Sequence, residues 1–302
     1  MTTLAGTFKF LRTCVALPLL GVWVGASGAE AGPALSAQQL RASHTALQGQ
    51  LRDNPFRRPL LLDSQEAQER LTGEIHAVLA YPFSSVRSAL NDPARWCEVL
   101  SLHSNTKYCR ASAPAPDRAL LIYVGSKTPQ ALSIATRVDM AYTLQSDTPE
   151  YLAVTLRAPN GPLGTSDYRV MLESIPLADG TTYIHLTYST ATNLLARMAM
   201  QAYLATAGSG KVGFTPAATP PGGPPEFIAG ARGAVERNTM RYYLAIDAYL
   251  ASLQAAPTLQ LETRLQDWFS AVERYPRQLH EMERQDYLDM KRAEHLRQQA
   301  PP

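Results

Sequence analysis

The sequence predicts an α+β fold in which an antiparallel sheet packs on a long C-terminal helix, between an N-terminal arm and a helical extension. Apolar and polar residues alternate in successive stretches between residues 132 and 188, as in strands with one covered face. Asp179-Gly180 lies between two of these stretches and is a strong hairpin signal. Residues 233–253 then repeat apolar side chains at helical spacing, so they are predicted to cover the sheet.

The first 31 residues have the three-part layout of a secretory signal peptide. Lys9 and Arg12 precede an apolar run from Thr13 to Val24, and Ala29-Glu30-Ala31 is a small-x-small cleavage pattern. The apolar run is shorter than the roughly 20 residues that span a bilayer. We therefore expect a cleaved, secreted, periplasmic protein with no transmembrane span; the alternative is an uncleaved N-terminal anchor.

Residues 32–72 are predicted to form a helix and an arm. Leu40, Leu47 and Leu51 follow helical spacing within residues 36–53. Two prolines and mixed charges follow in "NPFRRPLLLDSQEAQERLTG", which suggests a segment laid over the main domain. That domain is expected to span residues 73–255, from Gly73 onward.

The main domain opens with a strand and two short helices. In "GEIHAVLAYPF" apolar residues alternate until Pro82 ends the strand. The stretch "SSVRSALNDPARWCEVLSL" is helical in two pieces, the second beginning at Asp92-Pro93. Cys97 then lies in the second helix, and Cys109 lies where the next extended stretch begins.

Cys97 and Cys109 are the two cysteines that remain once Cys14 leaves with the signal peptide. An oxidising compartment favours a disulfide between them. A metal site that includes His103 and a reactive thiol are the alternatives. Zinc would need about four ligands, and Cys97, His103 and Cys109 supply three without a recognisable finger spacing.

Two segments flank the long helix. Before it, residues 193–206 read as a helix and residues 208–227 as a Gly/Pro-rich loop, long enough to have a function. The "GSGK" in this loop lacks the rest of a phosphate-binding motif. After it, residues 256–302 are rich in Glu, Arg and Gln with an apolar helical stripe, and are predicted to pack on their own domain or to dock a protein partner.

Composition excludes some classes of function. The chain has 28 basic and 26 acidic residues, so its formal charge is +2, and loss of residues 1–31 would leave 26 basic and 25 acidic residues, or +1. A nearly neutral chain is unlike a nucleic-acid binder that relies on phosphate contacts. Apolar residues make up 45% of the chain and charged residues 18%, which is enough for a sizeable core.

This order of elements resembles the START-like superfamily, whose members include lipid-transfer, pollen-allergen-like and polyketide cyclase-like proteins. The residues that carry the resemblance are "AVLAYPFSSVRSALNDPARWCEVL" and "VERNTMRYYLAIDAYLASL", and it covers residues 73–253. The resemblance implies the helix-grip fold, a curved antiparallel sheet wrapped on the long helix, with a cavity for an apolar ligand between them. The 208–227 loop and the C-terminal extension depart from the family pattern.

The candidate ligand-binding residues lie on the covered face of the sheet and on the long helix. Tyrosines suit such a site because they combine an apolar ring with a hydroxyl that orients a ligand. For each of them, ordinary core packing is the alternative. The candidates are Met140, Tyr142, Tyr168, Tyr188, Tyr242, Ile246 and Tyr249.

No catalytic residue, metal ligand or cofactor is assigned from the sequence. His76 and His185 lie on strands opposite to the apolar positions and are expected to face solvent, and Glu236 and Asp247 lie off the apolar side of the long helix. Ser166 has no evident partner base. The leading hypothesis is therefore a non-enzymatic protein that binds or transfers an apolar, lipid-like molecule. The alternatives are an assembly protein that docks a partner through its C-terminal helices, and a cyclase or hydrolase that uses the same cavity.

Overall fold

A computed structural model describes residues 34–67, 69–112, 119–161, 164–191, 194–206, 208–217 and 225–299. The predicted signal peptide and part of the Gly/Pro-rich loop lie outside these residues. The described residues between Ala31 and Pro302 form one compact unit. Within them, no helix combines the length and the apolarity that a bilayer crossing demands.

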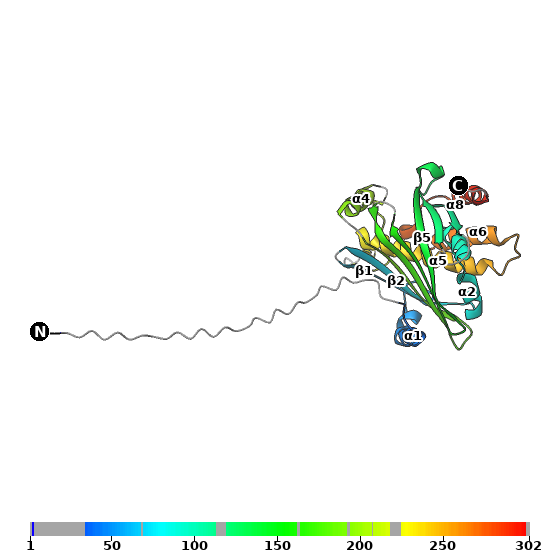
Figure 1. Cartoon of the computed structure of the whole chain (residues 1–302), viewed down its shortest axis with the longest axis horizontal. Helices are drawn as coiled ribbons and strands as arrows, with labels where there is room; N and C mark the ends of the chain where they lie inside the picture. Colours follow the sequence, from blue (N-terminus) through cyan, green and yellow to red (C-terminus); the bar gives the residue numbers. More distant parts are fainter. Residues whose placement is uncertain are drawn as a thin grey trace. The chain divides into compact units, whose positions relative to one another are not determined.

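The centre of the fold is a curved, eight-stranded antiparallel sheet with the order β1-β2-β8-β7-β6-β5-β4-β3 (Figure 1). In this order β2 pairs with β8, the last strand in the chain, and β1 pairs with the other side of β2. The hairpin predicted at Asp179-Gly180 joins β7 to β8, with Gly180 at a φ of +83°. The strands are β1 Leu60–Ala67, β2 Arg70–Leu79, β3 Thr106–Ala111, β4 Ala119–Val124, β5 Thr136–Thr148, β6 Tyr151–Asn160, β7 Ser166–Pro176 and β8 Thr182–Ala191.

The helices surround this sheet, and the two short ones that the sequence predicts lie between β2 and β3. Ser36 caps the first helix in a capping box with Gln39, and Asp92 caps α3. The helices are α1 Ala37–Arg52, α2 Phe83–Leu90, α3 Pro93–Leu100, α4 Leu194–Ala205, α5 Gly230–Ser252, α6 Gln260–Val272, α7 Pro276–Leu279 and α8 Arg284–Gln298, with a 3-10 turn at Leu132–Ile134.

Helix α5 packs across the inner face of the sheet, which confirms the α+β fold with a helix-grip arrangement (Figure 1). The contact is close at Gly73 of β2, where an added Cβ would lie 2.2 Å from Oγ1 of Thr239. Only glycine leaves room for the helix at this point. The main apolar core forms here, from the inner side chains of the strands together with Met240, Leu244 and Ile246 of α5.

The arm after α1 contains an element that the sequence analysis did not identify. Residues 60–67 form β1, which pairs with β2 along its whole length from Leu60 opposite Ala77 to Ala67 opposite Arg70. Its apolar residues come as a short run, "LLL", followed by polar ones, so no alternation marks it as a strand.

Helix α1 covers part of the outer face of the sheet. Leu40 and Leu51 pack with Tyr151, Ile175 and Tyr183 in a second, smaller apolar cluster. The expectation that His76 and His185 face solvent is therefore wrong for His185, which is only 8% exposed beneath this layer. Alternation along a strand shows which side chains share a face, but it does not show what covers that face.

The C-terminal extension packs on its own domain. Trp268 and Phe269 of α6 and Tyr287 of α8 are buried in the main core, on the side of α5 away from the sheet. The sequence left two alternatives for this segment, packing on its own domain and docking of a protein partner, and the structure shows the first.

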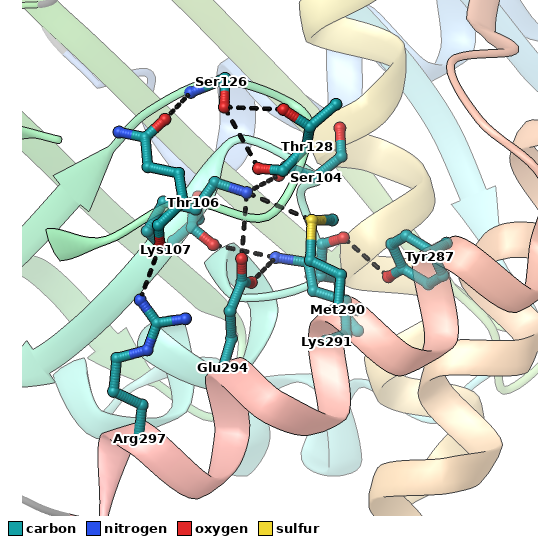
Figure 2. A network of polar contacts seen from close by, with 12 residues as sticks. Ser104, Thr106, Lys107, Ser126, Thr128, Tyr287, Met290, Lys291, Glu294 and Arg297 are labelled. Carbon is teal, nitrogen blue, oxygen red and sulfur yellow. Dashed lines mark hydrogen bonds and ion pairs between the residues drawn. The ribbon is translucent and has the colours of Figure 1, made fainter. Parts of the chain in front are cut away.

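Buried ions attach α8 to β3 (Figure 2). Glu294 accepts hydrogen bonds from Nζ of Lys107 at 3.0 Å and from Nζ of Lys291 at 2.7 Å. Lys107 also donates to Ser104 O, and Lys291 to Thr106 O. Burial lowers the pKa of both lysines, that of Lys291 to about 8. One carboxylate thus supports two buried cations.

The expected disulfide joins Cys97 in α3 to Cys109 in β3, with a Cα–Cα distance of 5.2 Å. It closes a short loop and holds the second short helix against the edge of the sheet. The disulfide prediction is therefore confirmed, and the metal and free-thiol alternatives for these two cysteines are excluded.

Replacing Glu294 by Gln should destabilise the protein by roughly 3–5 kcal/mol, because two buried cations would lose their common counter-ion. Urea unfolding measures the change. Asp289→Asn is the matched control on the same helix, since Asp289 pairs with Arg292 at the surface. Equal stability of the two variants would show that the buried network contributes little.

Removing the disulfide with the double change Cys97→Ser and Cys109→Ser should cost about 3 kcal/mol, since the unfolded chain would regain the freedom of a short loop. Thermal unfolding with and without a reductant measures this loss. The reductant should lower the melting temperature of the wild type but not that of the double variant. A wild type that is insensitive to complete reduction would contradict the expectation.

Candidate functional site

A cavity of about 90 Å³ lies between the inner face of the sheet and α5, where a START-like protein is expected to hold its ligand. Its apolar walls come from α3, β4 and β5, and its polar groups come from the turn after α3, from the segment after β4 and from α5. It is far smaller than the roughly 300–1,000 Å³ of pockets for drug-sized ligands. The apolar lining residues are Leu100, Ile122, Val124, Val138 and Met140, and the polar ones include His103, Lys127, Tyr168, Asn238, Arg241 and Tyr242.

His103 is the most unusual group in this cavity. It follows α3, where its backbone N–H donates to Leu100 O. Its side chain is buried, and Nε2 makes no hydrogen bond to any described residue. Burial and the nearby charges of Arg241 and Lys291 lower the pKa of His103 to about 3. A neutral imidazole with one unused nitrogen can bind a polar group of a ligand.

Two tyrosines form one side of the cavity, and a third packs behind them. The hydroxyls of Tyr168 and Tyr242 lie 3.2 Å apart, and the ring of Tyr188 packs on both neighbours. Burial raises the pKa of all three phenols, so they stay neutral. Their rings are apolar walls, and the paired hydroxyls are a weakly polar spot within them.

One end of the cavity is positively charged. Lys127, Lys211 and Arg241 all form ion pairs with Glu281, at 2.5, 3.5 and 2.5 Å, so three cations meet one carboxylate. Burial, with the nearby charge of Arg241, lowers the pKa of Lys127 to about 8. Lys127 and Arg241 also line the cavity. A net positive charge at this end suits a negatively charged or strongly hydrogen-bonding ligand group.

The seven candidate ligand-binding residues predicted from the sequence fall into two groups, those at the cavity and those in the main core. Met140, Tyr168 and Tyr242 line the cavity, and Tyr188 packs directly behind the last two. The other three lie in the main core, away from the lining residues; they are Tyr142, Ile246 and Tyr249.

Sequence reasoning missed the cationic end of the cavity. Arg241 sits next to Tyr242 on the predicted long helix, and this adjacency was the one available signal. Lys127 and Glu281 lie in connecting segments 154 positions apart in sequence, where no periodicity places them side by side. The sequence marks His103 as a metal-ligand candidate beside the cysteines and as an acid–base candidate just past a helix end, but not as a cavity residue.

A larger groove of about 690 Å³ opens between α3, β3, α6 and α8. The Cys97–Cys109 disulfide and Leu261 contribute to its wall. Charged groups in it already pair with each other, Glu98 with Arg264 and Lys291 with Glu294. The groove is more open than the inner cavity, and these four charged groups already have partners.

No family model and no curated protein matches this chain. Solved structures that resemble it include human StAR-related lipid transfer protein 5, with a TM-score of 0.35 and 9% identity over 72% of this chain and 98% of that one. A conserved protein from Geobacillus kaustophilus has a TM-score of 0.36 and 14% identity over 60% of this chain and 95% of that one. Human STARD10 has a TM-score of 0.29 and 7% identity over 60% of this chain and 79% of that one. All three TM-scores are below 0.5, so the helix-grip assignment rests on the packing of the sheet and α5 described above.

Because His103 is buried and neutral, acid should destabilise the protein in a way that depends on this residue. Its pKa is about 3 in the folded chain against 6.5 for the ordinary value, so the unfolded state binds more protons between these pH values. Stability is therefore complete above pH 6.5 and falls as the pH falls toward 3. From pH 7 to pH 5 the loss is about 2 kcal/mol.

The His103→Leu variant should lack this part of the acid sensitivity. Urea unfolding of wild type and variant at pH 7 and pH 5 gives the difference, in which the contributions of all other groups cancel. His280→Leu is the control, because His280 is partly exposed and pairs with Glu273. Equal acid sensitivity of His103→Leu and wild type would show that His103 takes up a proton inside the fold.

Proposed function

We propose that this protein binds a small, mainly apolar molecule with one polar or anionic end in the cavity between the sheet and α5. The observation that carries the proposal is the combination of apolar walls with the unused Nε2 of buried His103. Buried polar atoms in proteins are almost always hydrogen-bonded, so an exception inside a cavity points to a ligand group. Lys127 and Arg241 supply the positive charge for the polar end.

The ligand must displace side chains as it enters. A volume of about 90 Å³ holds a few water-sized groups, and a longer apolar chain does not fit beside the present rotamers. Met140 is the lining residue that moves at least cost, because its unbranched side chain has three rotatable bonds. Binding of a lipid-like molecule is therefore coupled to repacking of the cavity wall.

The proposal is for binding and transfer without turnover. With a pKa of about 3, His103 is a poor general base near neutral pH, where an effective base has a pKa close to the working pH. Its neutral ring is suited to orienting a ligand.

We further propose that the protein acts outside the cytoplasm, in the periplasm. The charged start, the apolar run and the small-x-small pattern of residues 1–31 support export. The Cys97–Cys109 disulfide also supports it, since structural disulfides persist mainly in oxidising compartments.

The first test is to express the chain with its N-terminal segment, purify it from the periplasmic fraction and record native mass spectra with organic extraction. The proposal expects a protein found in that fraction, starting near Gly32, with an apolar molecule bound. A cytoplasmic, unprocessed chain would contradict the location, and this result is separate from the ligand result.

Binding in the cavity is tested with anilinonaphthalene sulfonate, which combines apolar rings with one anionic group. Val138→Phe should weaken binding of this dye at least tenfold, because the new ring fills the cavity. Leu261→Phe is the matched control in the large groove and should bind as the wild type does. Overpacking costs about 1–3 kcal/mol, so thermal unfolding must show that both variants fold. Weakened dye binding by Leu261→Phe with unchanged binding by Val138→Phe would place the ligand in the groove. A folded wild type that does not bind the dye would overturn the proposal.

A further inference from the structure

Two histidines and a glutamate meet on the outer face of the sheet, on the side away from the cavity. His76 of β2 and His185 of β8 are directly opposite each other in the strand pairing, and their rings stack with centres 4.3 Å apart. Glu74 precedes His76 by two residues and so lies on the same face. One ligand atom from each of the three lies within 4.8 Å of the others.

We infer that Glu74, His76 and His185 bind one divalent transition-metal ion of the zinc class. Two imidazoles and one carboxylate are a typical set of three protein ligands for zinc, with the fourth position left to water. Ligand atoms on a tetrahedral zinc ion lie roughly 3.3 Å apart, given bonds of about 2.0–2.1 Å. The ligand atoms, which lie within 4.8 Å of one another, must therefore draw together by up to about 1.5 Å, and Glu74, which is 37% exposed, has the freedom to move.

The neighbours of the two rings support this assignment more strongly than the three ligands alone. Nδ1 of His185 lies 3.1 Å from Oε2 of Glu173, and Nδ1 of His76 lies 2.8 Å from the hydroxyl of Tyr183. Both rings are thus held through Nδ1, which leaves Nε2 as the metal-binding atom. Metal-binding histidines generally have their other nitrogen bonded to a carboxylate or another polar group in this way.

These supporting groups are themselves fixed. Glu173 is fully buried and accepts hydrogen bonds from the hydroxyl of Tyr151 at 2.6 Å and from the backbone N–H of Leu35 at 2.5 Å. The hydroxyl of Tyr183 also lies 3.3 Å from Oγ of Ser43 in α1. The outer groups hold both imidazoles close together. Because the two rings are parallel, to within 1°, metal binding must turn them until both Nε2 atoms point at one ion, and it must give up the weak contacts of His185 with Glu74 and Thr187, at 3.6 and 3.4 Å.

The site also has an open side. Glu74 and His76 are partly exposed, so an ion can enter from solvent, whereas His185 forms the buried wall. The ring of His44 in α1 packs at a tilt against that of Tyr183, with ring centres 4.8 Å apart, so the N-terminal helix lies beside the site. A bound ion would link β2 to β8 next to α1.

The test is titration of the chelator-treated mature protein with ZnCl₂ by isothermal calorimetry. The expected result is one zinc per chain and a higher melting temperature with zinc. His76→Gln should weaken binding at least a hundredfold, and Tyr183→Phe, which removes only the supporting hydroxyl, should weaken it by roughly ten- to a hundredfold. His280→Gln, which changes a histidine outside the cluster, should bind as the wild type does.

The melting temperature of each metal-free variant shows whether it is folded, and Tyr183→Phe keeps the test decisive if His76→Gln does not fold. A folded wild type that binds no zinc would overturn the inference. Binding that survives both His76→Gln and Tyr183→Phe would also overturn it, since the zinc would then lie elsewhere. In either case Glu173 and His185 would be a buried ion pair that stabilises the sheet.

Discussion

The burial of α5 on both sides is the constraint on which the rest of the structure depends. The sheet covers one side of this helix, and α6 covers the other. Three of its charged residues are buried, namely Glu236, Arg237 and Arg241. Glu236 accepts hydrogen bonds from Ser64 and from the backbone of Phe214 and Thr215, and Arg241 pairs with Glu281. Every polar group on such a helix needs a partner from another segment. The arm, the α4–α5 connection and the C-terminal extension supply those partners, so they are parts of the core.

The same constraint explains the character of the cavity. With α5 held from both sides, the helix lies close to the sheet, and about 90 Å³ is left between them. The charged residues that α5 brings into the interior give one end of this space its positive charge. A ligand that enters must therefore repack a tightly held wall, and its polar end meets groups that already have a fixed geometry. For the proposed ligand, selectivity would then depend on the free-energy cost of that repacking as much as on its contacts.

The sequence predicts the individual helices and strands better than it predicts which segments pack against each other. Alternation along β5 to β8 and the spacing of Tyr242, Ile246 and Tyr249 are local signals, and they correctly place a sheet on a long helix. They do not show that α1 covers part of the other face of the sheet. The strand β1, the attachment of Lys107 to Glu294 and the meeting of Lys127 with Glu281 arise from residues far apart in the chain. Their partners depend on tertiary packing, which no local pattern contains. For the same reason Tyr168 and Tyr242 reach the cavity while Ile246 and Tyr249, chosen by the same rule, lie in the core.

The order of strands also sets the sequence of events as the chain is made. Strand β2 pairs on one side with β1 and on the other with β8, whose partner positions lie more than 100 residues later, as with His76 and His185. A chain that emerges N-terminus first therefore has the β1–β2 hairpin long before β8 exists to close the sheet. Until then one edge of β2 remains unpaired and can join the wrong strand. Such long-range pairing slows folding and leaves the early hairpin prone to aggregation until β8 has been made.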